Sequence, residues 1–433
     1  MQNESTEGSP GAIAADQASG ARSFYGWKIV GISIVSQAFA SGLTTYVFGL
    51  FQKPVAAEFG ASFGQVGFGM TLMMVATSLF APLLGVALDR HSIRAIMMIG
   101  AVSMSAGFAL MSIASALWVL GLLFGVLVGL GMLALGNNGC TKLVANWFVK
   151  YRGRALGMSA VGTSVGGLLA PPVMVLAIDR YGWRGALICA ALAVAPVAIP
   201  LVWLVVVNRP EDLGMVPDGN NGLPSPANRS AAGAAQETEQ SFGVLLRELN
   251  FWVITLSVGV CFAAISSVIA NLHPYATDLG VGSGPAALLL SCISICGIGG
   301  KLLFGTATDY FPARHGLWLA MAGLAVFLGV LLSHPGYGVL LLGAICGGLS
   351  LGGFLPVWCA LIGRCYGRQA FGRVMGLMFS AMGPLLWVVF PFTGWVRDRT
   401  GNYDAAFMTF LFALALAAGL LSFLRLPERE PGI

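Results

Sequence analysis

Charged residues are scarce in this sequence. Asp, Glu, Lys and Arg make up 9% of its 433 residues, whereas hydrophobic residues make up 57%. Soluble domains carry about 25% charged residues, so this composition excludes an ordinary soluble protein and indicates one embedded in a lipid bilayer. The formal net charge of +5 is modest and does not indicate nucleic-acid binding.

Cysteine and histidine are also few. The 8 cysteines lie in or beside apolar runs, no two of them form a C-x-x-C pair, and the 4 histidines form no cluster next to them. This pattern excludes the usual spacing of zinc and iron–sulfur ligands. It predicts reduced thiols that pack as small apolar groups, with no metal and no cofactor.

Two further motifs are missing. The sequence contains no P-loop, which argues against transport driven by nucleotide hydrolysis. The first 22 residues lack both the basic start and the apolar core of a signal peptide, so we expect a disordered tail over residues 1–24.

Long apolar runs, in contrast, fill most of the chain. A helix needs about 20 apolar residues to cross the hydrocarbon core of a bilayer. Twelve such runs lie at 25–50, 64–88, 93–114, 117–142, 154–177, 184–207, 250–272, 285–308, 316–334, 337–362, 373–396 and 403–425. The sequence therefore predicts an all-α, polytopic membrane protein with twelve transmembrane helices.

The two halves of the chain repeat each other. "GVALDRHSIR" at 85–94 and "GTATDYFPAR" at 305–314 share Gly, Asp and Arg at the same spacing. A second set recurs at a nearly identical offset: Arg154, Gly157, Pro172, Asp179, Arg180, Gly182 and Ala186 match Arg373, Gly376, Pro391, Asp398, Arg399, Gly401 and Ala405. Such a repeat of six helices is typical of transporters built from two pseudo-symmetric bundles.

The repeat divides the chain into domains. We expect six-helix bundles over 25–207 and 250–425, a Pro-, Gly- and Ser-rich cytoplasmic linker over 208–249, and a cytoplasmic tail over 426–433. With the N-terminus inside, most of the 23 Lys and Arg residues fall on the cytoplasmic side. Both termini are therefore predicted to be cytoplasmic, in a multi-pass protein of a cell inner membrane.

The loop between the second and third helices carries a family motif. Gly85, Asp89, Arg90 and Arg94 resemble the Gly-xxx-Asp-Arg-xxx-Arg pattern of the major facilitator superfamily. Within that superfamily, the stretch 146–172 is similar to the signature of the monocarboxylate porters and the oxalate/formate exchangers. The resemblance covers almost the whole chain and implies alternating access between two helical bundles.

The resemblance also implies a cytoplasmic gate. Asp89 is expected to face the start of helix eleven near Arg373, and Asp309 the start of helix five near Arg154, while the cytoplasmic side is closed. Each acid would interact with an Arg or a helix N-terminus. The full set of candidate gating residues is Asp89, Arg90, Arg94, Arg154, Asp309, Arg314 and Arg373. The alternative is that these are solvated charges that only fix topology.

Lys301 stands within the predicted eighth helix. Counted from Asp309 at the cytoplasmic end, it lies about 12 Å inside a hydrocarbon core about 30 Å thick. A charge at this depth costs several kcal/mol unless it faces water or a partner. Because no other Asp, Glu, Lys or Arg lies deep in the twelve segments, the predicted partner is an anionic substrate. Backbone carbonyls or a polar cluster are the alternative partners.

The resemblance places this lysine in the porters' substrate position. They carry an Arg on helix eight at the spacing of Lys301, Gly305 and Asp309. An ammonium acts as a point charge and lacks the planar fork of a guanidinium, so the substrate range differs. Animal-type proton-coupled porters have an Asp where this chain has Gly297, which leaves Lys301 and His273 as candidate proton carriers. One cavity cation favours a monoanion over a dianion.

Other polar and aromatic residues within the helices complete the predicted substrate site. They are Gln37, Tyr46, Asn137, Asn138, Asn271, His273, Trp358 and Trp387. Amides in membrane helices often join neighbouring helices, so packing is the alternative role for the Asn and Gln residues. His273 is equally consistent with an interfacial side chain.

Together these patterns predict a secondary transporter that acts as a monomer in the lipid bilayer. Its substrate would be a small organic monoanion, with a monocarboxylate as the first candidate and protons as a candidate coupling ion. A carrier for another amphipathic solute, such as an aromatic acid, a vitamin or an exported drug, is the main alternative. A membrane-embedded enzyme or sensor would need an intramembrane His/Asp/Glu cluster or a soluble domain, and the sequence shows neither.

Overall fold

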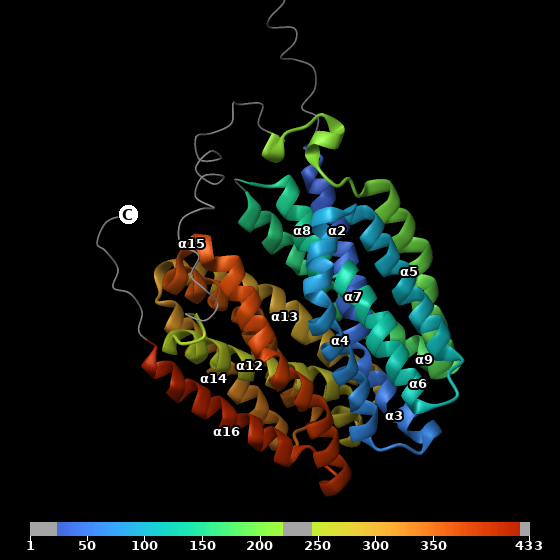
Figure 1. The fold of residues 1–433 in the computed structure, drawn as a ribbon. Coiled ribbons are helices and arrows are strands. Elements are labelled where there is room, and N and C mark those ends of the chain that lie inside the picture. The colour runs from blue at the N-terminus through green and yellow to red at the C-terminus, as the bar shows by residue number, and fades with distance from the viewer. Residues whose placement is uncertain (1–23, 150, 220–244, 425–433) are drawn as a thin grey trace, which may run out of the picture.

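The computed structural model describes residues 24–149, 151–219 and 245–424, and every regular element in that part of the chain is a helix. Figure 1 shows their arrangement. The first half contains α2 (Gly26–Ser41), η1 (Gly42–Tyr46), α3 (Phe48–Phe59), α4 (Phe63–Arg90), α5 (Ile93–Ser112), α6 (Leu117–Leu123), η2 (Phe124–Val128), α7 (Gly129–Leu135), α8 (Asn137–Trp147), α9 (Arg152–Val205), η3 (Pro210–Leu213) and η4 (Pro217–Gly219). The second half contains α12 (Leu249–Asp278), α13 (Ser283–Tyr310), α14 (Ala313–Leu332), α15 (Tyr337–Thr400), α16 (Asp404–Leu420) and η6 (Leu421–Phe423).

The helices of the described residues confirm the predicted membrane crossings. Eleven stretches are long and apolar enough to cross a bilayer, and α15 supplies two of them, Tyr337–Tyr366 and Val374–Thr400. The longest, Arg152–Val205, is interrupted at Gly182, where φ is 69°. Gly182 lies between two predicted segments, so α9 comprises two crossings, and the described residues contain twelve.

Two crossings contain breaks that the sequence analysis does not predict. The first crossing runs through α2, η1 and α3, and η1 is a π-helical turn at Gly42–Tyr46. The fourth runs through α6, η2, α7 and α8, with a second π-helical turn at Phe124–Val128 and a break at Gly136. Such turns widen a helix locally and re-aim its side chains.

Small residues let the helices of the first half approach closely. A Cβ on Gly162 of α9 would lie 2.3 Å from the carbonyl oxygen of Ile34, and one on Gly166 would lie 2.3 Å from that of Ala38. Both carbonyls belong to α2. The two backbones are therefore in direct contact, as small residues spaced by four permit in membrane helices.

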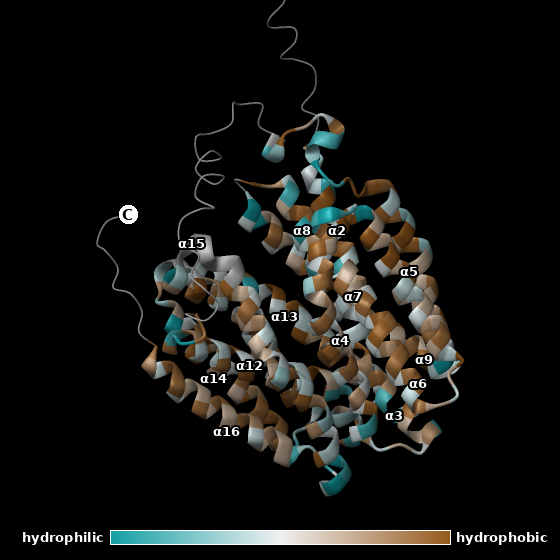
Figure 2. Ribbon diagram, in the orientation of Figure 1, coloured by the Kyte–Doolittle hydropathy of each residue, from teal (hydrophilic) through white to brown (hydrophobic). Residues whose placement is uncertain are grey.

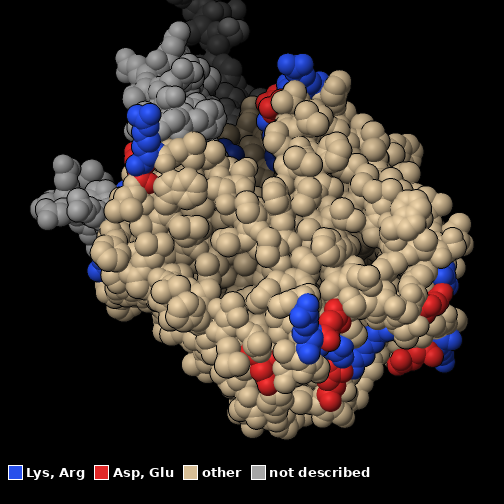
Figure 3. All heavy atoms as spheres, turned by 60° about the horizontal axis from the view of Figure 1, so that its bottom comes forward, with Lys and Arg blue, Asp and Glu red and all other residues tan. Residues whose placement is uncertain are grey.

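The surface has an uncharged belt between two charged ends. Figure 2 shows hydrophobic residues along most of the length of the helices, and Figure 3 shows charged side chains gathered at the ends. Large apolar side chains in the belt point outward, among them Leu79, Leu176 and Phe412, which are 64%, 68% and 66% exposed. A surface of this kind fits a lipid surrounding. We name its charged ends after Asp278 and Asp89, which lie at opposite ends of the bundle.

Helices α4 and α15, from different halves, touch at the Asp278 end and separate toward the Asp89 end. A Cβ on Gly394 would lie 2.6 Å from the backbone nitrogen of Gly64, and one on Gly67 would lie 3.1 Å from the carbonyl oxygen of Phe390. Gly85 lies about five turns along α4 from Gly67, and Gly376 about five turns along α15 from Gly394, so each pair shares a helix face. A Cβ on Gly85 or Gly376 would meet no atom within 4 Å.

This contact predicts opposite effects for alanine at the two ends of α15. Gly394→Ala forces a methyl group against the α4 backbone, and overpacking of this kind costs about 1–3 kcal/mol. We expect its Tm in detergent to fall by several degrees. Gly376→Ala places the same methyl group in open space, where alanine favours a helix, and its Tm should stay or rise slightly. Equal thermal shifts for the two variants would contradict the close contact.

Candidate functional site

Lys301 of α13 reaches across to α9 in the other half. Its ammonium donates hydrogen bonds to the carbonyl oxygen of Ala160 at 2.9 Å and to the hydroxyls of Thr163 and Ser164 at 3.1 Å each. The side chain is partly buried and its three partners lie on successive turns of α9. A lysine at the centre of the bundle is thus satisfied by uncharged acceptors.

Gln37 of α2 contacts the same stretch of α9. Its Nε2 donates to the carbonyl oxygen of Ser159 at 3.0 Å and to the Ser159 hydroxyl at 2.7 Å, while its Oε1 is buried without a hydrogen-bond partner in the described part of the chain. The α9 segment from Ser159 to Ser164 therefore receives polar side chains from both halves. Of the predicted substrate residues, Gln37 and Lys301 meet on this segment.

Tyr46 approaches α13 at Ser294, about two helical turns before Lys301. It is 6% exposed, and the hydroxyl of Ser294 on α13 donates to the carbonyl oxygen of Leu290 in its own helix at 2.9 Å. Gly167 of α9 packs against both, since a Cβ there would lie 2.1 Å from the Ser294 hydroxyl oxygen and 2.6 Å from the Tyr46 ring. Tyr46 thus lies at the same α9–α13 boundary as Lys301.

The two predicted tryptophans carry free indole N–H groups. Trp358 of α15 is 1% exposed and packs at 6.0 Å, centroid to centroid, against the Phe262 ring of α12. Trp387 is half-buried, and its backbone carbonyl accepts a hydrogen bond from Thr71 of α4 at 2.8 Å. Neither indole nitrogen has a hydrogen-bond partner among the described residues.

Asn271 and His273 lie on α12 toward the Asp278 end. The Asn271 amide donates to the carbonyl oxygen of Ser267 in its own helix at 2.8 Å. His273 is 7% exposed, and its Nε2 lies 3.1 Å from the hydroxyl oxygen of Ser283, at the start of α13. Its Nδ1 is buried with no partner in the described part of the chain.

Asn137 and Asn138, the two predicted amides of the fourth crossing, lie at the start of α8. Asn138 is half-buried in the first turn of α8, directly after the break at Gly136. The side chain of Asn137 lies outside the described residues. The structure therefore connects neither amide to Lys301.

At the Asp89 end, Asp89 pairs within its own half. Its carboxylate lies 2.5 Å from the Lys142 ammonium of α8, and both side chains are exposed. Arg94 also stays within the first half, donating from Nε to the carbonyl oxygen of Val206 at 2.5 Å. Arg90 and Arg154 are exposed. The predicted contact between Asp89 and helix eleven is thus absent among the described residues.

The remaining gating candidates belong to the second half. The Arg314 guanidinium lies 5.0 Å from the centroid of the Trp318 ring, a cation–π contact within α14. The side chains of Asp309 and Arg373 lie outside the described residues. Their predicted contacts therefore stay predictions.

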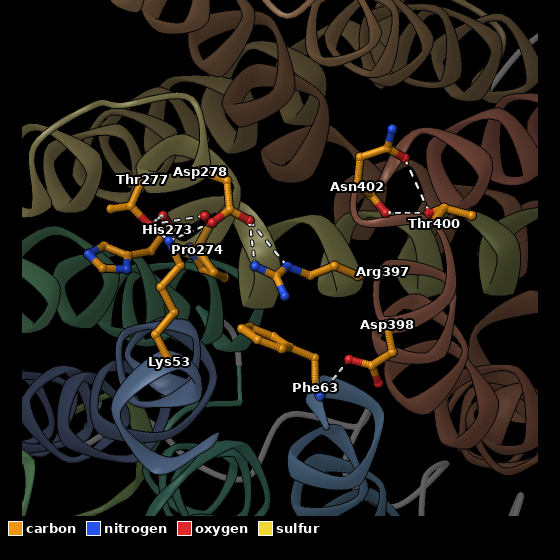
Figure 4. A network of polar contacts seen from close by, with 10 residues as sticks. All are labelled: Lys53, Phe63, His273, Pro274, Thr277, Asp278, Arg397, Asp398, Thr400 and Asn402. Carbon is orange, nitrogen blue, oxygen red and sulfur yellow. Dashed lines mark hydrogen bonds and ion pairs between the residues drawn. The ribbon is translucent and has the colours of Figure 1, made fainter. Parts of the chain in front are cut away.

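A charged network that the sequence analysis missed joins the halves at the Asp278 end. The Asp278 carboxylate of α12 lies 2.6 Å from the Lys53 ammonium of α3 and 2.8 Å from the Arg397 guanidinium of α15. Lys53 also donates to the hydroxyl of Thr277 at 2.6 Å. Figure 4 shows the three charged side chains converging from three helices. At 36%, 31% and 18% exposure for Lys53, Asp278 and Arg397, the pairs are partly shielded from water.

Asp398 adds a second link beside this network. Its carboxylate accepts hydrogen bonds at 2.8 Å from the backbone N–H groups of Phe63 and Gly64, the first residues of α4. A carboxylate there satisfies free donors and the positive end of the helix dipole. The Arg397 guanidinium stacks on the Phe63 ring at 3.6 Å. The one signal in the sequence was the repeat of Asp179 as Asp398, which marks the position but gives no partner.

An ion pair of similar exposure, between Arg184 and Glu58, also lies at the Asp278 end but within the first half. Arg184 donates to Glu58 at 2.7 Å, and the indole N–H of Trp183 donates to the same carboxylate at 2.5 Å. These two donors hold the pKa of the Glu58 carboxyl below its usual range. Unlike Asp278, Glu58 does not bridge the two halves.

Known proteins resemble this chain along nearly its full length. Residues 34–300 and 254–433 match the sequence model of the Major Facilitator Superfamily. The chain is 28% identical over 431 residues to "Monocarboxylate transporter 12" of Mus musculus, an alignment that covers 94% of this chain and 86% of that protein. It is also 28% identical over 425 residues to "Monocarboxylate transporter 11" of Homo sapiens, covering 94% and 84%.

Solved structures share the fold. A D-xylose-proton symporter matches with a TM-score of 0.69 and 16% identity, over 93% of this chain and 98% of that one. A bacterial homologue of the human lysosomal transporter Spinster, in an inward-facing and occupied conformation, matches with a TM-score of 0.61 and 17% identity, over 93% and 94%. The chain therefore belongs to the Major Facilitator Superfamily, as a multi-pass membrane transporter of its monocarboxylate-porter-like branch and not an enzyme.

Proposed function

We propose that this transporter moves a small organic monoanion, specifically a monocarboxylate, by alternating access. The observation that carries the proposal is the Lys301 ammonium between the two halves, whose three hydrogen-bond acceptors are all uncharged. A charge held this deep in a bilayer protein favours an anionic ligand. The curated relatives over 94% of the chain are named monocarboxylate transporters, which supports the same substrate class.

The conformation supports the alternating-access part of the proposal. In the predicted topology the Asp278 end is extracellular and the Asp89 end is cytoplasmic. The Lys53–Asp278–Arg397 network and the Gly64–Gly394 contact hold the halves together outside. Open space beside Gly85 and Gly376 supports separation inside. This arrangement is consistent with an inward-facing carrier, in which Asp89 pairs with Lys142 of its own half.

We further propose that the network around Asp278 is the extracellular gate. An ion pair must break before the halves can part at that end, and its partial burial makes it stronger than a fully exposed pair. The candidate gate at Asp89 would form in the opposite state. Protons remain a candidate coupling ion, with Lys301 and His273 as candidate carriers.

The proposed substrate predicts an effect of removing the charge of Lys301. In proteoliposomes tested with formate, lactate and pyruvate, with and without a proton gradient, the native protein should take up at least one of the three. Lys301→Ala should lower that uptake at least 100-fold, because the carboxylate loses its counter-charge, while the amount of folded protein stays the same. Lys28→Ala, which removes an exposed lysine, serves as the control. Native uptake rates in Lys301→Ala would refute the assignment.

The second prediction concerns the extracellular gate. Asp278→Asn removes the charge that joins Lys53 to Arg397, so the outward-facing population should grow. We expect cysteines placed at the extracellular ends of α4 and α15, on the faces where the two helices touch, to react several-fold faster with a membrane-impermeant thiol reagent added outside. Glu58→Gln removes an ion pair of similar exposure that does not cross between halves, and it should leave the rate unchanged. The gate assignment fails if both variants react alike.

A further inference from the structure

The partners of Lys301 satisfy its hydrogen bonds but not its charge. An ammonium has three N–H donors, and here all three have acceptors: Ala160 O, Thr163 Oγ1 and Ser164 Oγ. None of the three is ionised. The inference below rests on the proposed function, since it assumes that a carboxylate arrives to balance this charge.

The two hydroxyls are in different states. The Thr163 hydroxyl donates its own proton to the carbonyl oxygen of Ala160 at 2.9 Å. Ser164 is 2% exposed, and among the described residues its hydroxyl accepts from Lys301 but donates to no acceptor. A buried donor without a partner costs free energy, so a ligand that accepts a hydrogen bond from this O–H would be stabilised.

The position of Ser164 brings this donor close to the neighbouring turn of α13. A Cβ on Gly297 would lie 3.8 Å from the Ser164 hydroxyl oxygen, with no atom nearer than the carbonyl oxygen of Gly348 at 3.6 Å. Gly297 lies one turn before Lys301, on the same face of the helix. A side chain at position 297 would therefore point at the bond between Lys301 and Ser164.

We propose that Ser164 and Thr163 are substrate-binding residues that reverse their role when the carboxylate binds. In the empty carrier they accept hydrogen bonds from Lys301. In the loaded carrier the carboxylate accepts from the ammonium, because a bond between two charged groups is stronger than one to a neutral hydroxyl. The released hydroxyls rotate and donate to the carboxylate oxygens, and for this Thr163 gives up its hydrogen bond to the carbonyl oxygen of Ala160. Since α9 and α13 belong to different halves, the carboxylate is then held by both.

Removal of each hydroxyl tests this role. The probe is whichever of formate, lactate and pyruvate the native protein transports fastest, and its Kd is measured on purified protein. Ser164→Ala and Thr163→Val should each raise that Kd about tenfold, because each loses one hydrogen bond to a charged group. Thr163→Ser keeps the hydroxyl and should bind within about twofold of native. Ser105→Ala removes a hydroxyl that donates to the carbonyl oxygen of Ala191 elsewhere in the first half, and it should bind normally.

An internal carboxylate provides a second test. Gly297→Asp places an anion beside Ser164 and Lys301, where it should compete with the substrate and raise the Kd at least tenfold. Gly297→Asn has nearly the same size without the charge, and it should change the Kd several-fold less. Since an added Cβ meets only ordinary contacts, both variants are expected to fold, which their Tm values check.

The outcomes separate this inference from the proposed function. If Lys301→Ala abolishes uptake but Ser164→Ala and Thr163→Val bind like the native protein, the role of the hydroxyls is overturned and the proposed function stands. Equal effects of Asp and Asn at position 297 would likewise contradict it. If the native protein transports none of the three carboxylates, both are rejected.

Discussion

The structure depends on one partly buried ammonium at the boundary between its two halves. A cation in the interior of a membrane protein is stable only if its hydrogen bonds are satisfied and its charge is balanced. The α9 segment that holds Lys301 meets the first condition with a carbonyl and two hydroxyls. In the proposed function, an anionic ligand meets the second condition.

The contacts between the halves differ at the two ends of the bundle. Ion pairs and close glycine contacts gather at the Asp278 end, whereas the glycines on the same helix faces meet open space toward the Asp89 end. In the proposed mechanism, opening of the extracellular side requires Asp278 to leave Lys53 and Arg397. Asp89 meanwhile pairs with Lys142 of its own half. In the proposed mechanism, each of the two states therefore has its own set of contacts at one charged end.

Hydrophobicity and repeats predicted the fold almost completely, because membrane helices must be long, apolar and separated by polar loops. The π-helical turn at Gly42–Tyr46 escaped prediction, since it leaves the apolar composition of the run unchanged. Lys301 was predicted as a substrate-binding residue from its depth and from the resemblance to the porters. Its partners Thr163 and Ser164 were not, because nothing local in a sequence pairs residues so far apart. The Asp278 network was missed for the same reason.

Charge discrimination at Lys301 is the most direct test of the account. Isothermal titration of the purified native protein with a transported carboxylate and its neutral amide, such as lactate and lactamide or pyruvate and pyruvamide, compares ligands of nearly equal shape. The account predicts that the carboxylate binds at least 100-fold more tightly, and that Lys301→Gln removes most of this difference. Equal affinity of the native protein for the acid and its amide would contradict it.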